Sequence, residues 1–454
     1  MIKKYISTVL VFCILTLTVF CTGCSSTKNS IKIFDAKGNE LIVVNAISDD
    51  FSELENKENR AYIEAVITEA LELISKAQKI SIKEARKYLL KNNCQIHTAF
   101  DNDIYNAINS GYQDLNNDKL SYGCAITDLN GNIIALYSSN SNKNTYTNYA
   151  TTKTPPYSSF KPLSVYTPAI EKSIINWSSV YLDSPVKKIS DGDNKTVDWP
   201  KNSTGTYSKD NETIAYSIKT SLNTVAVKCL QDVGVKDSLS FMEDKFGLVL
   251  DFEKSKAYKQ GEDEVIGNIA LGYLNEVISP NDMAGYYQIF ANGGKYTQPH
   301  TILKITNNIG ATIYEYSSNE EQVIEPSTAY IMNKLLQNTT SPGGTADEAI
   351  VEGVSVGGKT GTGDNGNWFV GFTPEYTCAI WHGKEIDGNN SCKIFSTTVS
   401  KFTHDTNKNF PYCSEIKKAV YCPESGMLFS RNCYKTEMGY YVLENTPKTC
   451  NIHK

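Results

Sequence analysis

The order of strand-like and helical segments is the feature that most constrains the fold. Two strand-like runs, residues 122–128 and 132–138, meet across Asn130 and Gly131, a pair that is typical of tight hairpin turns. Three further strand-like runs come much later, at residues 354–363, 367–373 and 376–382. Helical patterns lie between the two groups, at residues 158–173, 213–232 and 280–292. This order predicts an α+β domain with one antiparallel sheet that is closed by both ends of the segment.

The N-terminus has the order of an export signal. Lys3 and Lys4 precede an uncharged run, residues 5–20, after which small residues lead into Cys24. This junction resembles a bacterial lipobox, in which the cysteine is lipidated and becomes the first residue of the mature chain. An uncleaved transmembrane anchor is the alternative, since about 20 apolar residues span a bilayer. Both interpretations place the rest of the chain on the outer face of the cell membrane.

Composition excludes several classes of protein. Hydrophobic residues make up 40% of the chain and charged residues 21%, which permits a sizeable core and excludes global disorder. The 44 Lys and Arg residues are outnumbered by 50 Asp and Glu residues, for a net charge of -6. A nucleic-acid surface needs a clustered basic excess, so we expect no nucleic-acid partner.

Two helical patterns precede the first predicted strand. Residues 58–79 carry an apolar stripe with i, i+4 spacing, and Ser81 and Glu84 form a capping box at the start of a second helix. We interpret residues 1–24 as a signal peptide or membrane anchor, and residues 25–119 as a small helical linker region without catalytic residues.

Three short motifs follow one another in the longer segment. They are SxxK at Ser158 and Lys161, SxN at Ser221 and Asn223, and KTGT at Lys359, Thr360, Gly361 and Thr362. SxxK and SxN also occur elsewhere in the chain and are weak signals alone, whereas KTG occurs once. Their order and spacing leave room for an inserted helical subdomain before the last strands.

The residue types explain why such motifs recur together. A serine hydroxyl is a poor nucleophile at neutral pH and needs a base beside it. Ser158 and Lys161 share one helix face, and burial near other cations lowers a lysine pKa, so Lys161 is a candidate base. Pro155 and Pro156 end any preceding helix, which places Ser158 in a first turn with free backbone N–H groups.

The other two motifs supply the remaining functions of such a site. Ser221 can relay a proton to a leaving group, and Asn223 can hold a substrate amide. Lys359 adds a second positive charge. Thr360 and Thr362, on a predicted edge strand, offer hydroxyls and backbone to an extended peptide that ends in a carboxylate.

The segment that contains the three motifs resembles a known family. Residues 120–403 are similar to the transpeptidase domain of penicillin-binding proteins, most of all to that of the class A members. The resemblance includes Pro162 after SxxK, the Pro200-Lys201-Asn202 stretch before SxN, and the residues around Gly293 and Trp368. It implies the penicillin-binding-protein or serine β-lactamase-like fold, an antiparallel sheet sandwiched by helices, over residues 120–405. Residues 406–454 form a Cys-rich C-terminal tail.

The resemblance also implies a function. Ser158 would attack the D-Ala-D-Ala carbonyl of a peptidoglycan stem peptide, with Lys161 as base and Ser221 as proton relay. The backbone amides of Ser158 and Thr362 would form the oxyanion hole. β-Lactams would acylate the same serine, and neither a cofactor nor a metal is expected.

Two departures from the family stand out. Tyr157 occupies the position before the nucleophile where the family usually has Gly. Class A proteins also carry an N-terminal glycosyltransferase domain, and the residues before Leu120 are too few to hold one. A separate glycosyltransferase partner is therefore implied.

Alternative functions stay open on sequence grounds. A D,D-carboxypeptidase or a β-lactamase would use water in place of the acceptor amine. Glu264 and Asn268 match the ExxxN spacing that some β-lactamases use to position that water, although the surrounding run is more typical of a buried segment. A non-catalytic penicillin sensor is disfavoured because only Met1 to Lys4 would lie inside, and a silent scaffold is the last alternative.

The chain has 12 cysteines, of which nine lie beyond the signal and Cys24. Cys94, Cys124 and Cys229 lie in patterned elements and are predicted to be buried as small hydrophobic residues. A zinc site is conceivable in the tail at Cys422, Cys433, Cys450 and His453, but close CxxC pairs are missing. Disulfides fit an exported protein better, and the odd count leaves at least one cysteine over.

Overall fold

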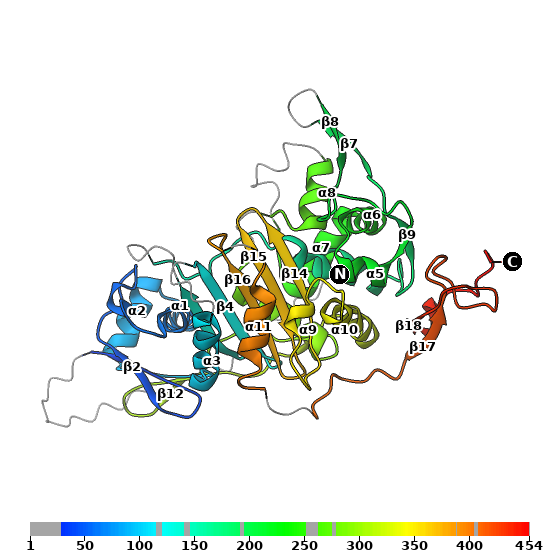
Figure 1. Ribbon diagram of the computed structural model, residues 1–454. Helices are drawn as coiled ribbons and strands as arrows, with labels where there is room; N and C mark the ends of the chain where they lie inside the picture. Colours follow the sequence, from blue (N-terminus) through cyan, green and yellow to red (C-terminus); the bar gives the residue numbers. More distant parts are fainter. Residues whose placement is uncertain are drawn as a thin grey trace, which may run out of the picture.

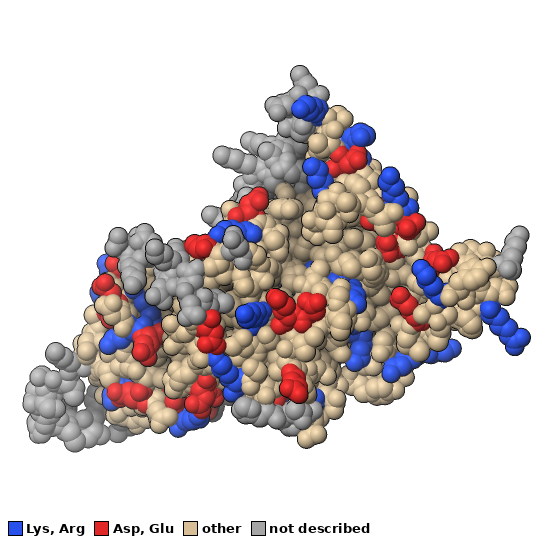
Figure 2. All heavy atoms as spheres, viewed as in Figure 1, with Lys and Arg blue, Asp and Glu red and all other residues tan. Residues whose placement is uncertain are grey.

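The computed structural model describes residues 29–114, 120–139, 146–190, 195–250, 262–274, 278–386, 388–403 and 407–453. The predicted signal segment and its Cys24 lie outside this part. Within it, no helix is both long and apolar enough to cross a bilayer. Figure 2 shows basic and acidic side chains interspersed over one face of the molecule.

A five-stranded antiparallel sheet forms the centre of the fold (Figure 1). Its order is β14 (Gly357–Gly363), β15 (Gly366–Phe372), β16 (Tyr376–His382), β4 (Tyr122–Asp128) and β5 (Ile133–Ser139). The strands from the two ends of the segment meet where β16 pairs with β4, with Cys378 opposite Ile126. The predicted α+β domain and its sheet are therefore confirmed, and β14, which carries KTGT, is an edge strand.

The β4–β5 hairpin forms where the sequence predicted it. The Asp128 carboxylate accepts the backbone N–H groups of Asn130 and Asn132 at 2.8 and 2.9 Å, and Gly131 adopts a positive φ of 83°. A turn of this kind favours glycine because L side chains rarely adopt that backbone conformation.

Helices cover both faces of the sheet. Side chains alternate along a strand, so Phe369 and Phe372 of β15 point to opposite faces. Phe369 packs on Phe395 of α11 (Ser391–Val399), whereas Phe372 packs on Phe290 of α9 (Pro280–Ala291). On the α11 face lies also α3 (Asn102–Gln113), which contacts α11 and β5, and α1 (Arg60–Gln78) contacts β5 as well. In the described ranges no strand pairs with the outer edge of β14, and the segment inserted in sequence between β5 and β14 packs beside this strand.

The inserted segment forms a helical lobe beside β14 (Figure 1). Its helices are α4 (Thr167–Glu171), α5 (Ile214–Thr220), α6 (Asn223–Val233), α7 (Val235–Phe246), α8 (Glu262–Leu271) and α10 (Pro326–Thr340). Its short strands are β6 (Val180–Leu182) with β9 (Asn211–Thr213), β7 (Lys187–Ser190) with β8 (Thr196–Trp199), and β10 (Lys295–Tyr296) with β13 (Glu321–Gln322). The pattern at residues 213–232, predicted as one helix, is divided into α5 and α6 at Ser221, which adopts a left-handed φ of 63°.

The N-terminal region is more than the helical linker that the sequence indicated. Helices α1 and α2 (Ile82–Lys91) agree with the two predicted helices, and the capping box formed by Ser81 and Glu84 is present. A second five-stranded sheet accompanies them, in the order β12 (Thr312–Glu315), β11 (Ile302–Thr306), β3 (Gln95–Thr98), β1 (Ile31–Phe34) and β2 (Glu40–Val44). Three of its strands are N-terminal and two come from the middle of the chain, and short strands of this kind have little periodicity of their own.

The tail forms a small hairpin of β17 (Ile416–Tyr421) and β18 (Glu437–Val442) at one end of the molecule (Figure 1). All nine described cysteines are free, so the disulfides expected in the tail are not what the structure shows. The reason is local: three tail cysteines surround one histidine instead of pairing. Cys94, Cys124 and Cys229 are fully buried, which confirms their prediction as small core residues.

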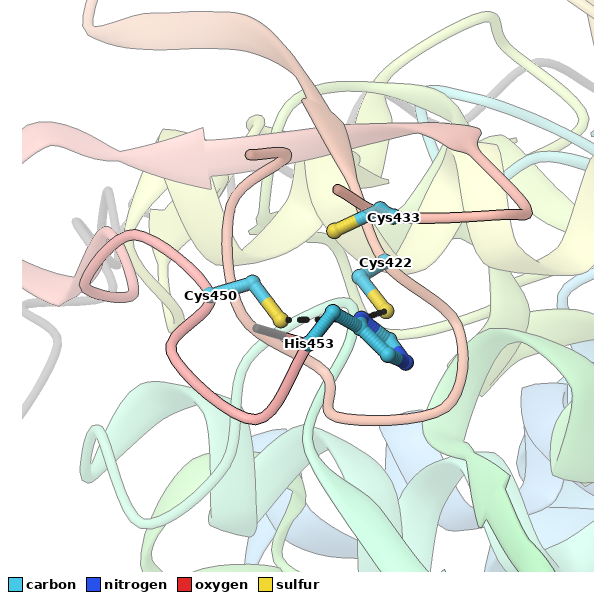
Figure 3. A group of neighbouring side chains, drawn as sticks. All are labelled: Cys422, Cys433, Cys450 and His453. Carbon is cyan, nitrogen blue, oxygen red and sulfur yellow. Dashed lines mark hydrogen bonds between the residues drawn. The ribbon is translucent and has the colours of Figure 1, made fainter. Parts of the chain in front are cut away.

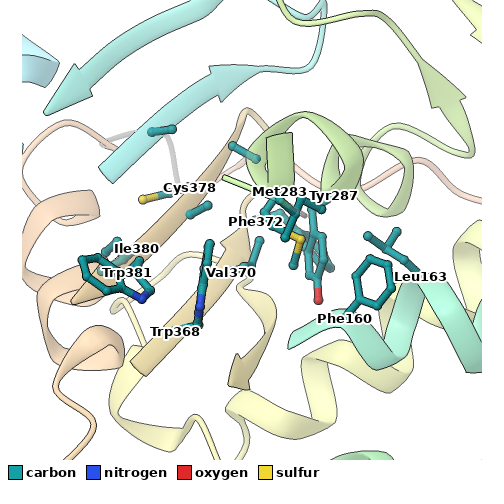
Figure 4. Close-up of a cluster of buried hydrophobic side chains, with 14 of the residues drawn as sticks. Phe160, Leu163, Met283, Tyr287, Trp368, Val370, Phe372, Cys378, Ile380 and Trp381 are labelled. Carbon is teal, nitrogen blue, oxygen red and sulfur yellow. The ribbon is translucent and has the colours of Figure 1, made fainter. Parts of the chain in front are cut away.

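Helix α9 connects the core to the segment that bears SxxK (Figure 4). Met283 and Tyr287 of α9 lie between Phe372 of β15 and the pair Phe160 and Leu163. The fully buried Tyr287 hydroxyl donates a hydrogen bond to the Ser159 carbonyl oxygen, next to Ser158. The core therefore fixes the turn in which Ser158 lies.

We predict that Tyr287→Phe lowers the free energy of unfolding by about 1 kcal/mol, because it leaves a buried carbonyl without this donor. Tyr166→Phe is the matched control. Tyr166 is also fully buried, but among the described residues its hydroxyl has no hydrogen-bond partner, so its loss should be neutral or stabilising. Urea denaturation of both variants checks this. Equal destabilisation by both would contradict the role given to the Tyr287 hydroxyl.

Candidate active site

Ser158 lies in a helical segment that changes its winding as it enters the core. A 3₁₀ turn, η2 (Tyr157–Phe160), starts directly after Pro155 and Pro156, as predicted. A π-helical turn, η3 (Pro162–Tyr166), and then α4 continue it. Ser158 is half-buried, whereas Lys161 is fully buried. A π turn within a helix is often found at functional sites.

Tyr157 explains why the resembled family has glycine at this position. Its φ is 50°, in the left-handed region that glycine adopts at no steric cost. Tyr157 is held there by its N–H, which donates to the Gly272 carbonyl at 2.9 Å, and by its hydroxyl, which accepts the Asn365 N–H at 3.0 Å. Its ring packs against Gly363, where a Cβ would lie 2.0 Å from the ring. The tyrosine thus joins the Ser158 turn to the end of β14.

The Lys161 ammonium points at the SxN segment. It donates to Asn223 Oδ1 at 2.6 Å and to the Ser221 carbonyl at 3.0 Å, and it lies 3.5 Å from Ser221 Oγ. Among the described residues, none of its hydrogen bonds runs to the Ser158 hydroxyl. The contact between Ser158 and Lys161 that the i, i+3 spacing predicted is therefore not made in this structure, although the two side chains belong to the same turn.

Ser221 joins the second and third motifs. The Lys359 ammonium donates to Ser221 Oγ at 2.9 Å, and it also reaches the Thr360 carbonyl at 3.1 Å. Lys359 lies on β14 and is fully buried, like Lys161. One hydroxyl thus lies within 3.5 Å of two lysine nitrogens that come from separate elements.

Burial sets the electrostatics of the two lysines. Loss of water disfavours the charged form, which lowers the pKa of Lys161 well below its usual value, and the charge of Lys359 lowers it further. Burial lowers the pKa of Lys359 to about 7. An amine with such a lowered pKa has a free lone pair near neutral pH, which is what a general base requires.

The edge strand β14 runs close past the Ser158 turn. At Gly361 a Cβ would lie 2.4 Å from the Pro156 carbonyl oxygen and 3.2 Å from the Ser159 nitrogen, so only glycine allows this approach. Thr360 is buried and Thr362 is exposed. The structure therefore brings all the predicted residues of the three motifs to one site beside an unpaired strand edge.

Asn223 begins α6, and both ends of its amide are engaged. Oδ1 accepts Lys161, and Nδ2 donates to the Lys201 carbonyl at 2.7 Å. One N–H of this Nδ2 group remains for a ligand, because a primary amide carries two.

Two positioning residues carried no role in the sequence analysis. Asn202 Oδ1 accepts the backbone N–H of Asn223 at 2.9 Å and lies 3.4 Å from that of Thr224, at the start of α6. Asn202 Nδ2 in turn donates to Asp183 at 2.8 Å. The Pro200-Lys201-Asn202 stretch was the signal in the sequence, but only the fold shows that it supports Asn223.

Asn389 is a second kind of missed residue. It follows the sheet in sequence, and its Nδ2 donates to Thr362 Oγ1 at 3.2 Å and to the Trp368 carbonyl at 3.3 Å. No motif marks it, because its position depends on the chain returning along β15 and β16. Of the two residues weighed for a deacylating water, Asn268 lies on α8, and the Glu264 side chain is outside the described part.

Comparison with known proteins identifies a family for most of the catalytic segment. The family model described as "Penicillin binding protein transpeptidase domain" matches residues 122–391. Penicillin-binding protein 1A of Clostridium botulinum is 32% identical over 267 residues, which are 56% of this chain and 30% of that protein. Penicillin-binding protein 4 of Bacillus subtilis is 28% identical over 351 residues, 71% of this chain and 52% of that protein. The matches thus span from about a third to about half of these relatives.

Solved structures give the same fold. The D,D-transpeptidase domain of a peptidoglycan glycosyltransferase from Eggerthella lenta superposes with a TM-score of 0.62 at 18% identity, covering 83% of this chain and 98% of that one. The penicillin-binding protein PonA1 of Mycobacterium tuberculosis gives a TM-score of 0.63 at 20% identity, covering 82% and 97%. The fold predicted from the resemblance is confirmed.

The buried lysines make stability depend on pH in a way that can be tested. The unfolded chain keeps the Lys359 proton up to about pH 10, whereas the folded chain loses it near pH 7, so the unfolded state binds more protons in between. The stability cost of the buried charge is full below pH 7 and shrinks as pH rises. From pH 7 to 9 the free energy of unfolding of the wild type should therefore rise more steeply than that of Lys359→Met, by about 1 kcal/mol per pH unit.

Urea denaturation at several pH values measures both slopes. Lys83→Met, at an exposed helix position, is the control and should keep the wild-type slope. Identical slopes for the wild type and Lys359→Met would show that folding does not deprotonate Lys359.

Proposed function

Because the chain belongs to the penicillin-binding protein transpeptidase family, we propose that it is an extracytoplasmic serine D,D-transpeptidase that cross-links peptidoglycan stem peptides. The observation that carries the proposal is the Ser221 hydroxyl between Lys161 and Lys359. Through these two contacts Ser221 connects the turn that carries Ser158 and Lys161, a lysine of lowered pKa, with the edge strand β14. These are the parts that acyl transfer through a serine needs.

The first step forms an acyl-enzyme on Ser158. Its Oγ attacks the carbonyl of the penultimate D-Ala, and the hydroxyl proton passes to the neutral amine of Lys161. Ser221 then relays a proton to the leaving nitrogen, the C–N bond breaks, and the terminal D-Ala leaves. The developing oxyanion accepts hydrogen bonds from the backbone amides of Ser158 and Thr362, which the close approach of β14 at Gly361 favours.

The stem peptide binds as an added strand along β14. Main-chain hydrogen bonds to an edge strand give affinity in this mode of recognition. The terminal carboxylate lies near Lys359 and the hydroxyls of Thr360 and Thr362, and the remaining N–H of Asn223 holds a substrate carbonyl. These steps need neither a metal nor an organic cofactor.

The second step decides the enzyme class. In a transpeptidase, an amine from a neighbouring strand attacks the acyl-enzyme and returns a proton to Ser158. In a D,D-carboxypeptidase or a β-lactamase, water takes that place. β-Lactams would acylate Ser158 in the first step. A protein of the same fold, penicillin-binding protein A from Mycobacterium tuberculosis, has been solved as an acyl-enzyme complex with imipenem.

The partners follow from the same proposal. Stem peptides of peptidoglycan are the substrates, and a separate glycosyltransferase supplies the glycan strands that carry them. The chain is held at the outer face of the cell membrane through a lipid on Cys24 or through an uncleaved apolar segment.

We predict that Ser158→Ala abolishes labelling by a fluorescent penicillin, because the variant has no hydroxyl to form the acyl bond. Ser159→Ala is the matched control, since the Ser159 hydroxyl is buried and donates to the Pro156 carbonyl at 2.5 Å. It should still be labelled. Gel fluorescence with folding checked by circular dichroism measures both. Equal labelling of Ser158→Ala and the wild type would place the nucleophile elsewhere.

Product analysis separates the enzyme classes. With a stem pentapeptide donor and an amine acceptor, the wild type should release D-Ala and form a cross-linked product in comparable amounts, and Lys161→Met should lower both rates by at least about 100-fold through loss of the base. Mass spectrometry of the products measures them. Release of D-Ala without any cross-linked product would replace the transpeptidase proposal by the carboxypeptidase.

A further inference from the structure

The tail brings three thiols and one imidazole to a single point (Figure 3). One ligand atom from each of Cys422, Cys433, Cys450 and His453 lies within 4.8 Å of the other three. His453 Nδ1 is 3.6 Å from Cys422 Sγ and 3.4 Å from Cys450 Sγ. Cys422 and Cys450 are buried, and Cys433 and His453 are half-buried. The four side chains come from three separate stretches of the tail.

These separations fit a tetrahedral metal ion. Zinc binds thiolate sulfur at about 2.3 Å and imidazole nitrogen at about 2.0–2.1 Å, so in a tetrahedron sulfur and nitrogen lie about 3.5 Å apart. The two observed nitrogen–sulfur separations, 3.4 and 3.6 Å, bracket this value. A disulfide needs sulfur atoms about 2.05 Å apart, and all three cysteines are free. Three cysteines and one histidine form one of the usual donor sets of structural zinc.

The surroundings of the cluster orient the ligands. His453 Nε2 lies 2.8 Å from a Glu424 carboxylate oxygen, which leaves Nδ1 directed at the sulfur atoms. A carboxylate on the far nitrogen of a histidine is typical of zinc ligands, because it fixes the ring and its tautomer. The sulfur atoms have donors of their own: the Ser430 N–H is 3.4 Å from Cys433 Sγ, and the Ser425 hydroxyl is 3.3 Å from Cys450 Sγ.

We propose that Cys422, Cys433, Cys450 and His453 bind one Zn²⁺ as a closed structural site. The sequence argued against zinc because close CxxC pairs are missing, and disulfides were expected because the chain is predicted to be exported. The structure supplies the missing proximity, since β17 ends just before Cys422 and the chain after β18 returns to the same end of the hairpin. On binding, three thiols release their protons to solvent and the imidazole stays neutral.

The metal holds the tail against the helical lobe. The turn that begins at Cys422 places the Gly426 carbonyl so that it accepts the Ser178 hydroxyl at 2.6 Å, and the Tyr441 hydroxyl of β18 donates to the same Ser178 at 2.8 Å. Ser178 lies just before β6, which pairs with β9, and α5 follows β9 directly. The zinc site therefore fixes the tail turn that contacts Ser178 of the helical lobe.

Metal content of the purified full chain tests the site directly. Inductively coupled plasma mass spectrometry should find one zinc per chain in the wild type, and Cys433→Ser/Cys450→Ser should lose essentially all of it. Cys413→Ser, which removes a buried tail thiol outside the cluster, should keep the full amount. Equal zinc in the wild type and the double variant would overturn the proposal. So would a disulfide between two of the three cluster cysteines in non-reducing mass spectrometry.

Two further measurements separate metal binding from a loss of folding. Cobalt added to the chelator-treated wild type should give a thiolate-to-cobalt charge-transfer band and the visible bands of tetrahedral cobalt. Glu424→Gln keeps all four ligands and should weaken zinc about 10- to 100-fold in competition with a chromogenic chelator. Octahedral cobalt spectra, or unchanged zinc affinity in Glu424→Gln, would contradict the assigned geometry. Penicillin labelling of the zinc-depleted wild type shows whether the transpeptidase site is intact, so failure of the two proposals is distinguishable.

Discussion

The burial of two lysines around one serine hydroxyl is the constraint on which the rest of the site depends. A buried ammonium group is costly unless hydrogen-bond acceptors replace water. Lys161 obtains them from the turn between α5 and α6, where two carbonyls and the Asn223 side chain face it. That turn exists only because Ser221 adopts a left-handed conformation, which costs a non-glycine residue on the order of 1–2 kcal/mol. Strain of this kind persists where the surroundings fix the backbone. Here Asn202 and Asp183 do so, because they accept hydrogen bonds from the first residues of α6.

The second lysine needs a rigid support, and the sheet provides it. Lys359 faces Ser221 from the edge strand β14. The neighbouring strand β15 is buried along its whole length, and the two strands pair without a break from Gly357 to Gly363 of β14. Because β14 has a partner on only one side, its outer edge is open where the Ser158 turn passes. The close contact at Gly361 means that the distance between strand and turn has little freedom. A rigid sheet of this kind helps an enzyme to keep its nucleophile at a fixed distance from the strand along which a peptide binds.

Much of this was predictable from sequence, and the rest was not for identifiable reasons. The hairpin at Asn130–Gly131, the edge position of KTGT and the start of the Ser158 turn follow from local patterns, and the structure has all three. The break of the helix at Ser221 was missed, since the turn there is held by contacts with residues far away in sequence, such as Lys161, 60 positions earlier. Asn389 and the Cys422–His453 cluster also depend on the return of distant segments. Disulfides were expected in the tail because the chain is predicted to be exported, and residue spacing could not show that three cysteines and a histidine meet.

The sheet that the N-terminal region shares with the middle of the chain limits where the chain can be divided. Its strand β3 pairs with β1 on one side and with β11, from the middle of the catalytic segment, on the other. Cutting the chain before residue 120 would strip β11 of this neighbour and expose a row of unpaired N–H and C=O groups. Open strand edges recruit other chains, so the shortened protein would be prone to aggregate. The N-terminal strands act as a permanent cover for an edge that the catalytic segment itself creates.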